Sequence, residues 1–163
     1  MKLDFLKGLT AESHVGYVVS DVDSNLKKLQ ETLGVALDVK SYLFAPQKAW
    51  SCGIPIPDLQ MRIAKCPIKN GVSFEYIQPM TQSGFHLLSL LSLGDQMNHV
   101  AFCTDHYDEY HTYFQEMGAV FVFEMEAYDG LIGYRRDFYA KLDGIPGIIE
   151  ILENAKPCPP VNC

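Results

Sequence analysis

Two stretches of the chain repeat the same order of hydrophobic and polar positions. The first runs from His14 to Gly34 and the second from His99 to Gly118. Each begins with a histidine in a run of β-branched and aromatic residues, passes through acidic residues into an amphipathic pattern with Gln-Glu near its end, and stops at a glycine. The spacing of the apolar positions predicts a strand and then a helix in each stretch. The chain therefore predicts two similar structural units.

The predicted helix of the first repeat has recognisable ends. Asp21–Ser24 offers N-terminal caps, and Gly34 is the residue type that ends helices. The apolar stripe between them consists of Leu26, Leu29 and Leu33. The second repeat predicts a matching helix with a cap within Asp105–Asp108 and a stripe made of Tyr110, Tyr113, Phe114 and Met117.

Both repeats also end alike, on a short strand pattern that follows a glycine, at Gly71–Gln78 and Gly147–Glu153. Further strand-like runs precede these at 59–65, 119–124 and 134–142. We therefore predict an α+β protein of two βαβββ modules, 1–80 and 98–153, joined by a helical linker at 81–97 and followed by a flexible tail at 154–163. An additional segment, 41–58, is rich in proline and aromatic residues, and we expect it to pack on its own module.

The phase of the first strand of each repeat places a histidine beside a small residue. Alternate residues of a strand share a face, so His14 lies on the face of Gly16, and His99 lies on the face of Ala101. The small residues leave space beside each histidine.

Each repeat also has a glutamate inside its otherwise apolar last strand, Glu75 and Glu150. A buried, unpaired carboxylate costs several kcal/mol or takes up a proton, so each glutamate predicts a nearby cation. A lone histidine or glutamate in a strand is usually a core or solvated residue, but matched positions in two repeats need a common explanation. Two imidazoles and two carboxylates form a candidate ligand set for a divalent Zn, Ni, Co or Mn ion, with Fe as a weaker candidate.

The composition is that of a globular protein. The chain has 163 residues, of which 48% are hydrophobic and 20% charged, which excludes disordered, collagen-like and coiled-coil classes. Its net charge of −7 argues against nucleic-acid and anionic-membrane partners. No stretch suits a signal peptide or a membrane span, and the five cysteines are irregularly spaced. We therefore expect reduced thiols and a cytoplasmic protein.

Four segments that contain the polar residues resemble the signature strands of the vicinal oxygen chelate superfamily. They are His14–Tyr17, Phe74–Pro79, Asn98–Phe102 and Gly147–Leu152. The superfamily contains glyoxalase I, methylmalonyl-CoA epimerase, extradiol dioxygenases and bleomycin-resistance proteins. The resemblance implies paired βαβββ modules whose curved sheets form a cleft, with the first and last strands of each module adjacent. It also implies that His14, Glu75, His99 and Glu150 are metal ligands, a set similar to that of glyoxalase I.

The chemistry implied by this resemblance is an isomerase or lyase reaction on a small 2-oxo, hydroxy or thioester compound. A metal polarises the substrate carbonyl and acidifies the neighbouring C–H group, and Glu150 or Glu75 then acts as the base. In the epimerase branch a separate glutamate base lies on the strand before that of Glu75. Gln60 falls at about that place, with Asp58 nearby. An amide cannot accept the proton, which argues against strict methylmalonyl-CoA epimerase activity.

Residues that bind the substrate are harder to assign. The candidates are Trp50, which could cover the cleft, and the cationic Arg62, Arg135, Arg136 and Lys141, for which a solvated position at a strand edge is the alternative. We expect the remaining histidines, His86, His106 and His111, to be solvated.

Two other function classes stay open. One is a metal-free small-molecule binding protein of the bleomycin-resistance type, although such proteins lack the full ligand set. The other is an Fe-dependent extradiol-type dioxygenase, which needs two histidines and one glutamate, so that Glu75 is one ligand too many. In each class the partner is a small molecule. The apolar 85–93 segment also favours a homodimer.

Overall fold

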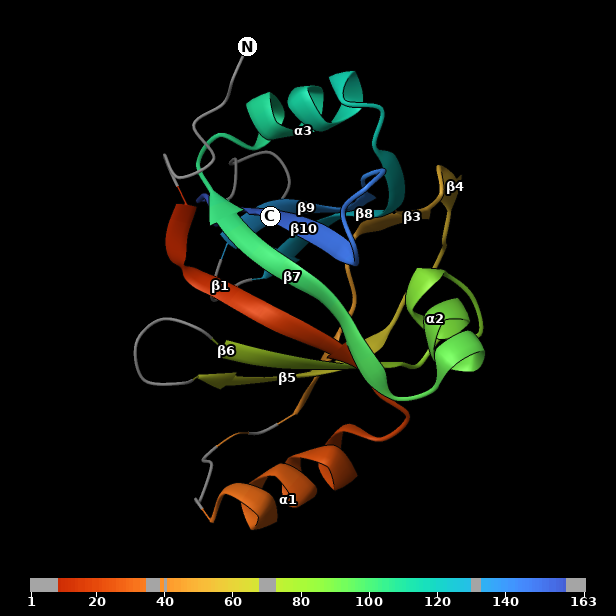
Figure 1. Cartoon of the computed structure of the whole chain (residues 1–163), viewed down its shortest axis with the longest axis vertical. Coiled ribbons are helices and arrows are strands. Elements are labelled where there is room, and N and C mark those ends of the chain that lie inside the picture. Colours follow the sequence, from red (N-terminus) through yellow and green to blue (C-terminus); the bar gives the residue numbers. More distant parts are fainter. Residues whose placement is uncertain (1–8, 35–38, 40, 68–72, 130–132, 158–163) are drawn as a thin grey trace.

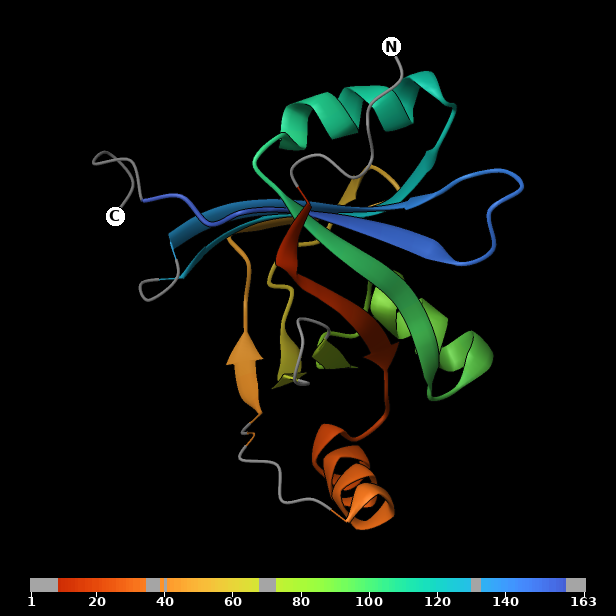
Figure 2. The same cartoon turned by 60° about the vertical axis from the view of Figure 1, so that its left-hand side comes forward.

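The computed structural model describes residues 9–34, 39, 41–67, 73–129 and 133–157. Within them the chain forms one curled mixed sheet and three helices (Figures 1 and 2). The strands are β1 (Leu9–Val18), β2 (Tyr42–Phe44), β3 (Lys48–Ser51), β4 (Ile54–Pro55), β5 (Met61–Pro67), β6 (Ser73–Pro79), β7 (Gln96–Thr104), β8 (Val120–Asp129), β9 (Gly133–Lys141) and β10 (Ile148–Glu153). Their order across the sheet is β2-β5-β6-β1-β7-β10-β9-β8-β3-β4.

The sheet has two similar halves that meet at its centre. β1 and β7 are antiparallel neighbours there. The last strand of each half lies parallel to its first, β6 beside β1 and β10 beside β7. β5 and β2 continue one half, and β9 and β8 continue the other. This arrangement confirms the predicted α+β class and the paired βαβββ layout.

Two helices cover the outer face of the sheet, one on each half (Figure 2). α1 (Val22–Leu33) buries Val22 and Leu26 against Ala64 and Cys66 of β5. α3 (Tyr107–Glu116) buries an aromatic group against Phe138 and Ile151. α2 (Phe85–Leu93) connects the halves and contacts β6, β1 and β7. None of the described helices is long and apolar enough to cross a membrane.

The predicted ends of α1 and the predicted start of α3 are both confirmed. The side chain of Asp21 accepts a hydrogen bond from the backbone N–H of Ser24, and Gly34 ends α1 in the left-handed conformation. The N-cap of α3 is His106, within the predicted Asp105–Asp108, but it makes no side-chain capping bond. Asp105 accepts a hydrogen bond from Asn154, so its carboxylate is used outside the helix.

We predicted that the 41–58 segment packs on its own module, and this is only partly right, because the segment also pairs with the other half. It contains β2, which extends the first half, and the short β3–β4 hairpin. β3 pairs antiparallel with β8 and so completes the edge of the second half (Figure 1). The unpaired edge of β8 explains this exchange, because a free strand edge offers a row of backbone hydrogen-bonding groups.

The inner face of the curled sheet carries most of the hydrophobic core. Apolar side chains from both halves meet there, among them Met61, Ile63 and Ile77 from the first half and Phe123 and Tyr139 from the second. The polar residues singled out in the sequence lie on this same face.

Candidate metal centre

Four neighbouring strands at the centre of the sheet each place one polar side chain on the inner face. In sheet order these are Glu75 on β6, His14 on β1, His99 on β7 and Glu150 on β10. The strand register aligns them, because Gly16 lies opposite both Glu75 and His99. Ala101 likewise lies opposite both His14 and Glu150. Partners in register share a face, so all four side chains point to one side.

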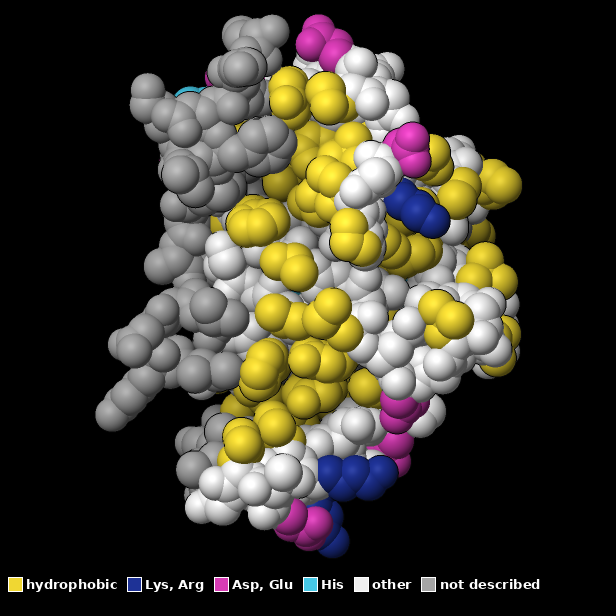
Figure 3. Space-filling view, viewed as in Figure 1, with side chains coloured by type: hydrophobic (Ala, Val, Ile, Leu, Met, Phe, Trp, Pro, Cys, Tyr) yellow, Lys and Arg dark blue, Asp and Glu magenta, His cyan; other side chains and the backbone are white. Residues whose placement is uncertain are grey.

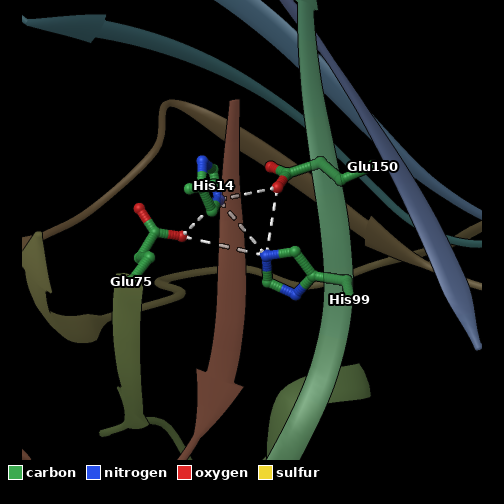
Figure 4. Close-up of side chains that lie close together, drawn as sticks. All are labelled: His14, Glu75, His99 and Glu150. Carbon is green, nitrogen blue, oxygen red and sulfur yellow. Dashed lines mark hydrogen bonds and ion pairs between the residues drawn. The ribbon is translucent and has the colours of Figure 1, made fainter. Parts of the chain in front are cut away.

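The four side chains converge on one point (Figure 4). His14 Nε2 lies 3.1 Å from Glu75 Oε2, 3.1 Å from Glu150 Oε2 and 3.3 Å from His99 Nε2. His99 Nε2 lies 3.1 Å from Glu150 Oε2 and 4.0 Å from Glu75 Oε2. One donor atom from each residue lies within 4.8 Å of all the others, and all four residues are buried.

The small residues between them are a geometric requirement. A Cβ atom on Gly16 would lie 1.9 Å from Cε1 and 2.0 Å from Nε2 of His99, far inside van der Waals contact. The imidazole of His99 therefore occupies the space that a side chain at Gly16 would fill. This confirms the prediction that the small residue leaves space beside a histidine.

Hydrogen bonds fix the orientation of His99. Its Nδ1 lies 3.1 Å from Asn98 Oδ1, and Asn98 Nδ2 donates a 2.9 Å bond to Ser89 Oγ on α2. An imidazole that donates from Nδ1 presents the lone pair of Nε2 to the cluster. Tyr139 of β9 packs its ring 4.7 Å from the ring of His99 and lies opposite Glu150 in the strand register.

The electrostatics of the cluster favour ionised glutamates. Burial opposes their ionisation, but Lys65 and His14 together hold the pKa of Glu75 well below its usual range. His99 and His14 do the same for Glu150 against its burial. Burial lowers the pKa of His14, yet the two carboxylates outweigh it and raise that pKa to about 10. Two buried negative charges thus share one small space with two imidazoles.

This donor set fits a divalent metal ion better than it fits a network of protons. Nε2 of His14 faces two carboxylate oxygens and a second ring nitrogen, and a single N–H cannot satisfy all three. A cation between the four atoms can satisfy all of them at once. Ligand atoms about 2.0–2.2 Å from a metal lie roughly 3 Å from their neighbours, which is the spacing observed. Imidazole with carboxylate suits Zn, Ni, Co and Mn, and Fe less well.

Comparison with known proteins supports the fold. No family model matches the sequence, and no curated protein matches it. Among solved structures, methylmalonyl-CoA epimerase from Mycobacterium tuberculosis superposes with a TM-score of 0.59 at 17% identity, covering 96% of this chain and 93% of that one. A variant of the Streptomyces coelicolor methylmalonyl-CoA epimerase in complex with 2-nitronate-propionyl-CoA gives 0.60 at 15% identity, covering 91% and 99%. The chain therefore has the glyoxalase-like α+β fold of these structures. A hypothetical protein from Bacillus halodurans C-125 is similar too, with a TM-score of 0.58 at 14% identity, covering 88% and 93%.

Within the glyoxalase-like fold, the cationic candidates separate by face. Arg62 lies on the outer face, where Nη1 bonds Asp23 of α1 at 2.9 Å. Arg136 also points outward, to Asp108 and Glu153. Arg135 lies on the inner face, where its charge interacts with the cluster's glutamates.

The two remaining candidates also lie away from the cluster. Trp50 of β3 sits opposite Glu124 and lines a cavity of about 440 Å³ beneath α3, on the outer face. Lys141 is exposed at the end of β9. Of the residues proposed for substrate binding, the structure brings only Arg135 toward the four-residue cluster.

Sequence reasoning missed residues that lie beside the cluster. Lys65 of β5 sits opposite Glu75, with its Nζ 3.4 Å from Glu75 Oε1. Asp137 of β9 is fully buried, and neither of its oxygens has a hydrogen-bond partner among the described residues. Both have the inward phase of their strands, but the strand pairing that brings them to the cluster cannot be read from phase alone.

One histidine was assigned wrongly. His86 is not solvated but 2% exposed, and neither ring nitrogen has a hydrogen-bond partner in the described part of the chain. It packs against the rings of Phe123 and Tyr139, because α2 turns this residue toward the inner face. Burial and the nearby His99 lower its pKa to about 3. His106 and His111 are partly exposed, and each contacts a glutamate, Glu109 and Glu124 respectively.

Proposed function

We propose that the protein is a divalent-metal-dependent isomerase or lyase that moves a proton next to the carbonyl group of a small molecule. The observation that carries this proposal is the convergence of His14, Glu75, His99 and Glu150 on one buried point. Bound there, a divalent metal would polarise a substrate carbonyl and make the neighbouring C–H group acidic. The substrate class is a 2-oxo, hydroxy or thioester compound.

The cluster's own glutamates are the candidate bases. Gln60 is exposed and precedes β5, so it does not face the cluster, and the inner face of β5 presents Met61, Ile63 and Lys65 instead. Asp58 is exposed as well. The absence of a carboxylate on this strand's inner face argues against an epimerase with a separate base there, and leaves Glu75 and Glu150.

The two glutamates differ in a way that favours Glu75 as the base. Oε2 of Glu150 lies 3.1 Å from both imidazoles, whereas Glu75 lies 3.1 Å from His14 but 4.0 Å from His99 and has its second oxygen beside Lys65. The histidines therefore hold Glu75 less closely, and Lys65 keeps its carboxylate ionised. A general base contributes about 10²–10⁴-fold to the rate.

The first experiment is the metal content of the protein purified without added metal or chelator. We expect near-stoichiometric Zn, Ni, Co or Mn in the parent and loss of metal from His99→Ala and Glu150→Ala. His111→Ala, which removes a partly exposed imidazole outside the cluster, is the matched control and should keep its metal. A parent that is empty and refuses added metal would overturn the proposal.

In the second experiment the metal-loaded protein is mixed with small carbonyl compounds in D₂O. NMR then follows the exchange of their C–H groups next to the carbonyl for deuterium. We expect exchange to fall by 10²-fold or more in Glu75→Gln, with a smaller fall in Glu150→Gln. A metal-free binding protein of the bleomycin-resistance type would bind its ligand without exchange. Uptake of oxygen with Fe bound would instead favour the extradiol-type reaction.

A further inference from the structure

Solvent reaches the four-residue cluster on one side. The side chains of His14 and His99 are 0% exposed and that of Glu150 is 2% exposed, whereas Glu75 reaches 7%. Lys65, whose ammonium touches Glu75 Oε1, is 34% exposed. Among the described residues, Lys65 therefore stands between the cluster and solvent, and a substrate that approaches Glu75 meets its charge.

A second cation comes to the same side from the other half of the sheet. Arg135 of β9 lies on the inner face, with its guanidinium 6.0 Å from the centre of the Phe44 ring at the far edge of the first half. Its charge interacts with Asp137 and, beyond it, with Glu75 and Glu150, and it opposes the ionisation of Lys65, whose pKa is raised because the glutamates outweigh burial and Arg135. Two positive side chains, one from each half, thus lie on the inner face within electrostatic range of the cluster.

The balance of charge changes when a metal binds. Three carboxylates, those of Glu75, Glu150 and Asp137, face the two cations in the metal-free protein. A divalent metal neutralises the two glutamates, which leaves Lys65 and Arg135 with only Asp137. The single charge of Asp137 can offset only one of the two cations. The metal-loaded site therefore has a positive side that needs an anion.

We propose that the substrate carries a carboxylate close to its reacting carbonyl, and that this carboxylate binds between Lys65 and Arg135. This inference rests on the proposed function. The contact between Lys65 and Glu75 limits the distance between the two groups of the substrate, which favours a 2-oxo or 3-oxo acid over a larger conjugate.

Acetoacetate and its neutral ethyl ester test this proposal, because they share the ketone and differ in the charge. Binding of each to the metal-loaded protein is measured by titration calorimetry, with the metal content of every variant recorded alongside. We expect the parent to bind acetoacetate at least tenfold more tightly than the ester. Lys65→Gln and Arg135→Gln should each remove this preference while the metal is retained, and Lys65→Arg should keep it.

Arg62→Gln is the matched control, since it removes the same charge from the outer face. It should leave the preference unchanged. Equal binding of the two probes by the metal-loaded parent, or no binding of acetoacetate, would overturn the carboxylate site and leave the metal-dependent function standing. So would a preference that survives in both glutamine variants. A parent without metal would overturn the proposed function itself.

Discussion

At the scale of single residues, the missing side chain of Gly16 is as important to the cluster as the ligands are. The ring of His99 fills the place where a Cβ atom on Gly16 would stand, 1.9 Å from the nearest ring atom. We expect Gly16→Ala to push His99 out of the cluster and to lower metal affinity at least tenfold, measured by competition with a metallochromic indicator. Val15→Ala, on the opposite face of β1, should bind as the parent does. Equal affinity in Gly16→Ala would contradict the geometry.

The protonation of His14 makes a prediction about pH. Its pKa, raised to about 10 by the two glutamates, means that the metal-free protein carries this proton at pH 7, while the glutamates are already ionised. A metal must displace the proton, so we expect release of about one proton per metal at pH 7 and affinity that rises with pH. Calorimetry in two buffers of different ionisation enthalpy measures the number of protons released. Metal binding without proton release would show that His14 is neutral.

The raised pKa of His14 also makes the metal-free protein less stable as the pH rises, whereas metal affinity increases. The pKa of His14 is higher in the folded state than the ordinary value of 6.5. Its contribution to the free energy of unfolding is therefore complete below about pH 6.5 and is lost as the pH rises toward 10. Metal binding and proton binding thus stabilise the fold at opposite ends of this pH range.

At the scale of elements, the connection between α2 and β7 determines how His99 is oriented. Ser89 of α2 holds Asn98, and Asn98 holds Nδ1 of His99. We expect Asn98→Ala to lower metal affinity about 10–100-fold without unfolding the protein, because partners behind a ligand typically contribute that much. Metal titration combined with thermal melting measures both effects. The matched control, Asn154→Ala, removes a hydrogen bond to Asp105 away from this connection and should not alter metal affinity, and a loss there would point to a general effect on folding.

The elements also show how far the sequence could be interpreted. Alternation of apolar and polar residues was enough to place His14, Glu75, His99 and Glu150 on inward positions, because a two-residue period fixes the face of each side chain. The pairing of residues on neighbouring strands could not be predicted in this way. Lys65 meets Glu75 only through the β5–β6 register, and β3 joins β8 across 70 or more residues. Such pairings depend on which edges remain free, and local pattern does not contain this information.

His86 shows a similar limit within a helix. The 85–93 segment is apolar almost all round, with a polar residue at several turns, so its pattern does not identify the buried face. The packing of α2 against three strands determines which of its faces is buried, and it turns His86 inward. α3 starts within the predicted region but has no capping side chain, because the carboxylates near its start bind Asn154 and Arg136.

At the scale of the whole molecule, the repeat explains why one chain can build the cluster. Each half contributes one histidine and one glutamate from its first and last strands, and the antiparallel β1–β7 pair brings the two sets together. Neither half holds more than two of the four ligands. A metal bound there would therefore link the halves and stabilise their pairing as well as supply chemistry.

The same arrangement leaves the middle of the sheet uncovered on its outer face. α1 and α3 cover the two ends, and hydrophobic side chains gather between them on the face shown in Figure 3. The exposed ones include Met97 at 57% and Val100 at 37% on β7. Beside them α2 exposes Leu88, Leu91 and Leu93 at 60%, 73% and 71%. Exposed apolar side chains on a strand and on the helix beside it are typical of an interface between protein chains.

We therefore expect a homodimer that buries α2 and β7. Light scattering after gel filtration should give twice the 18.3 kDa of one chain. A lysine in this surface would have to be desolvated in the dimer, so Leu91→Lys should shift the mass to that of a monomer while the metal is retained. Leu33→Lys, at a leucine that is 55% exposed on the end of α1, should stay dimeric. A parent that is monomeric at all concentrations, or a Leu91→Lys dimer, would show that this surface has another role or none.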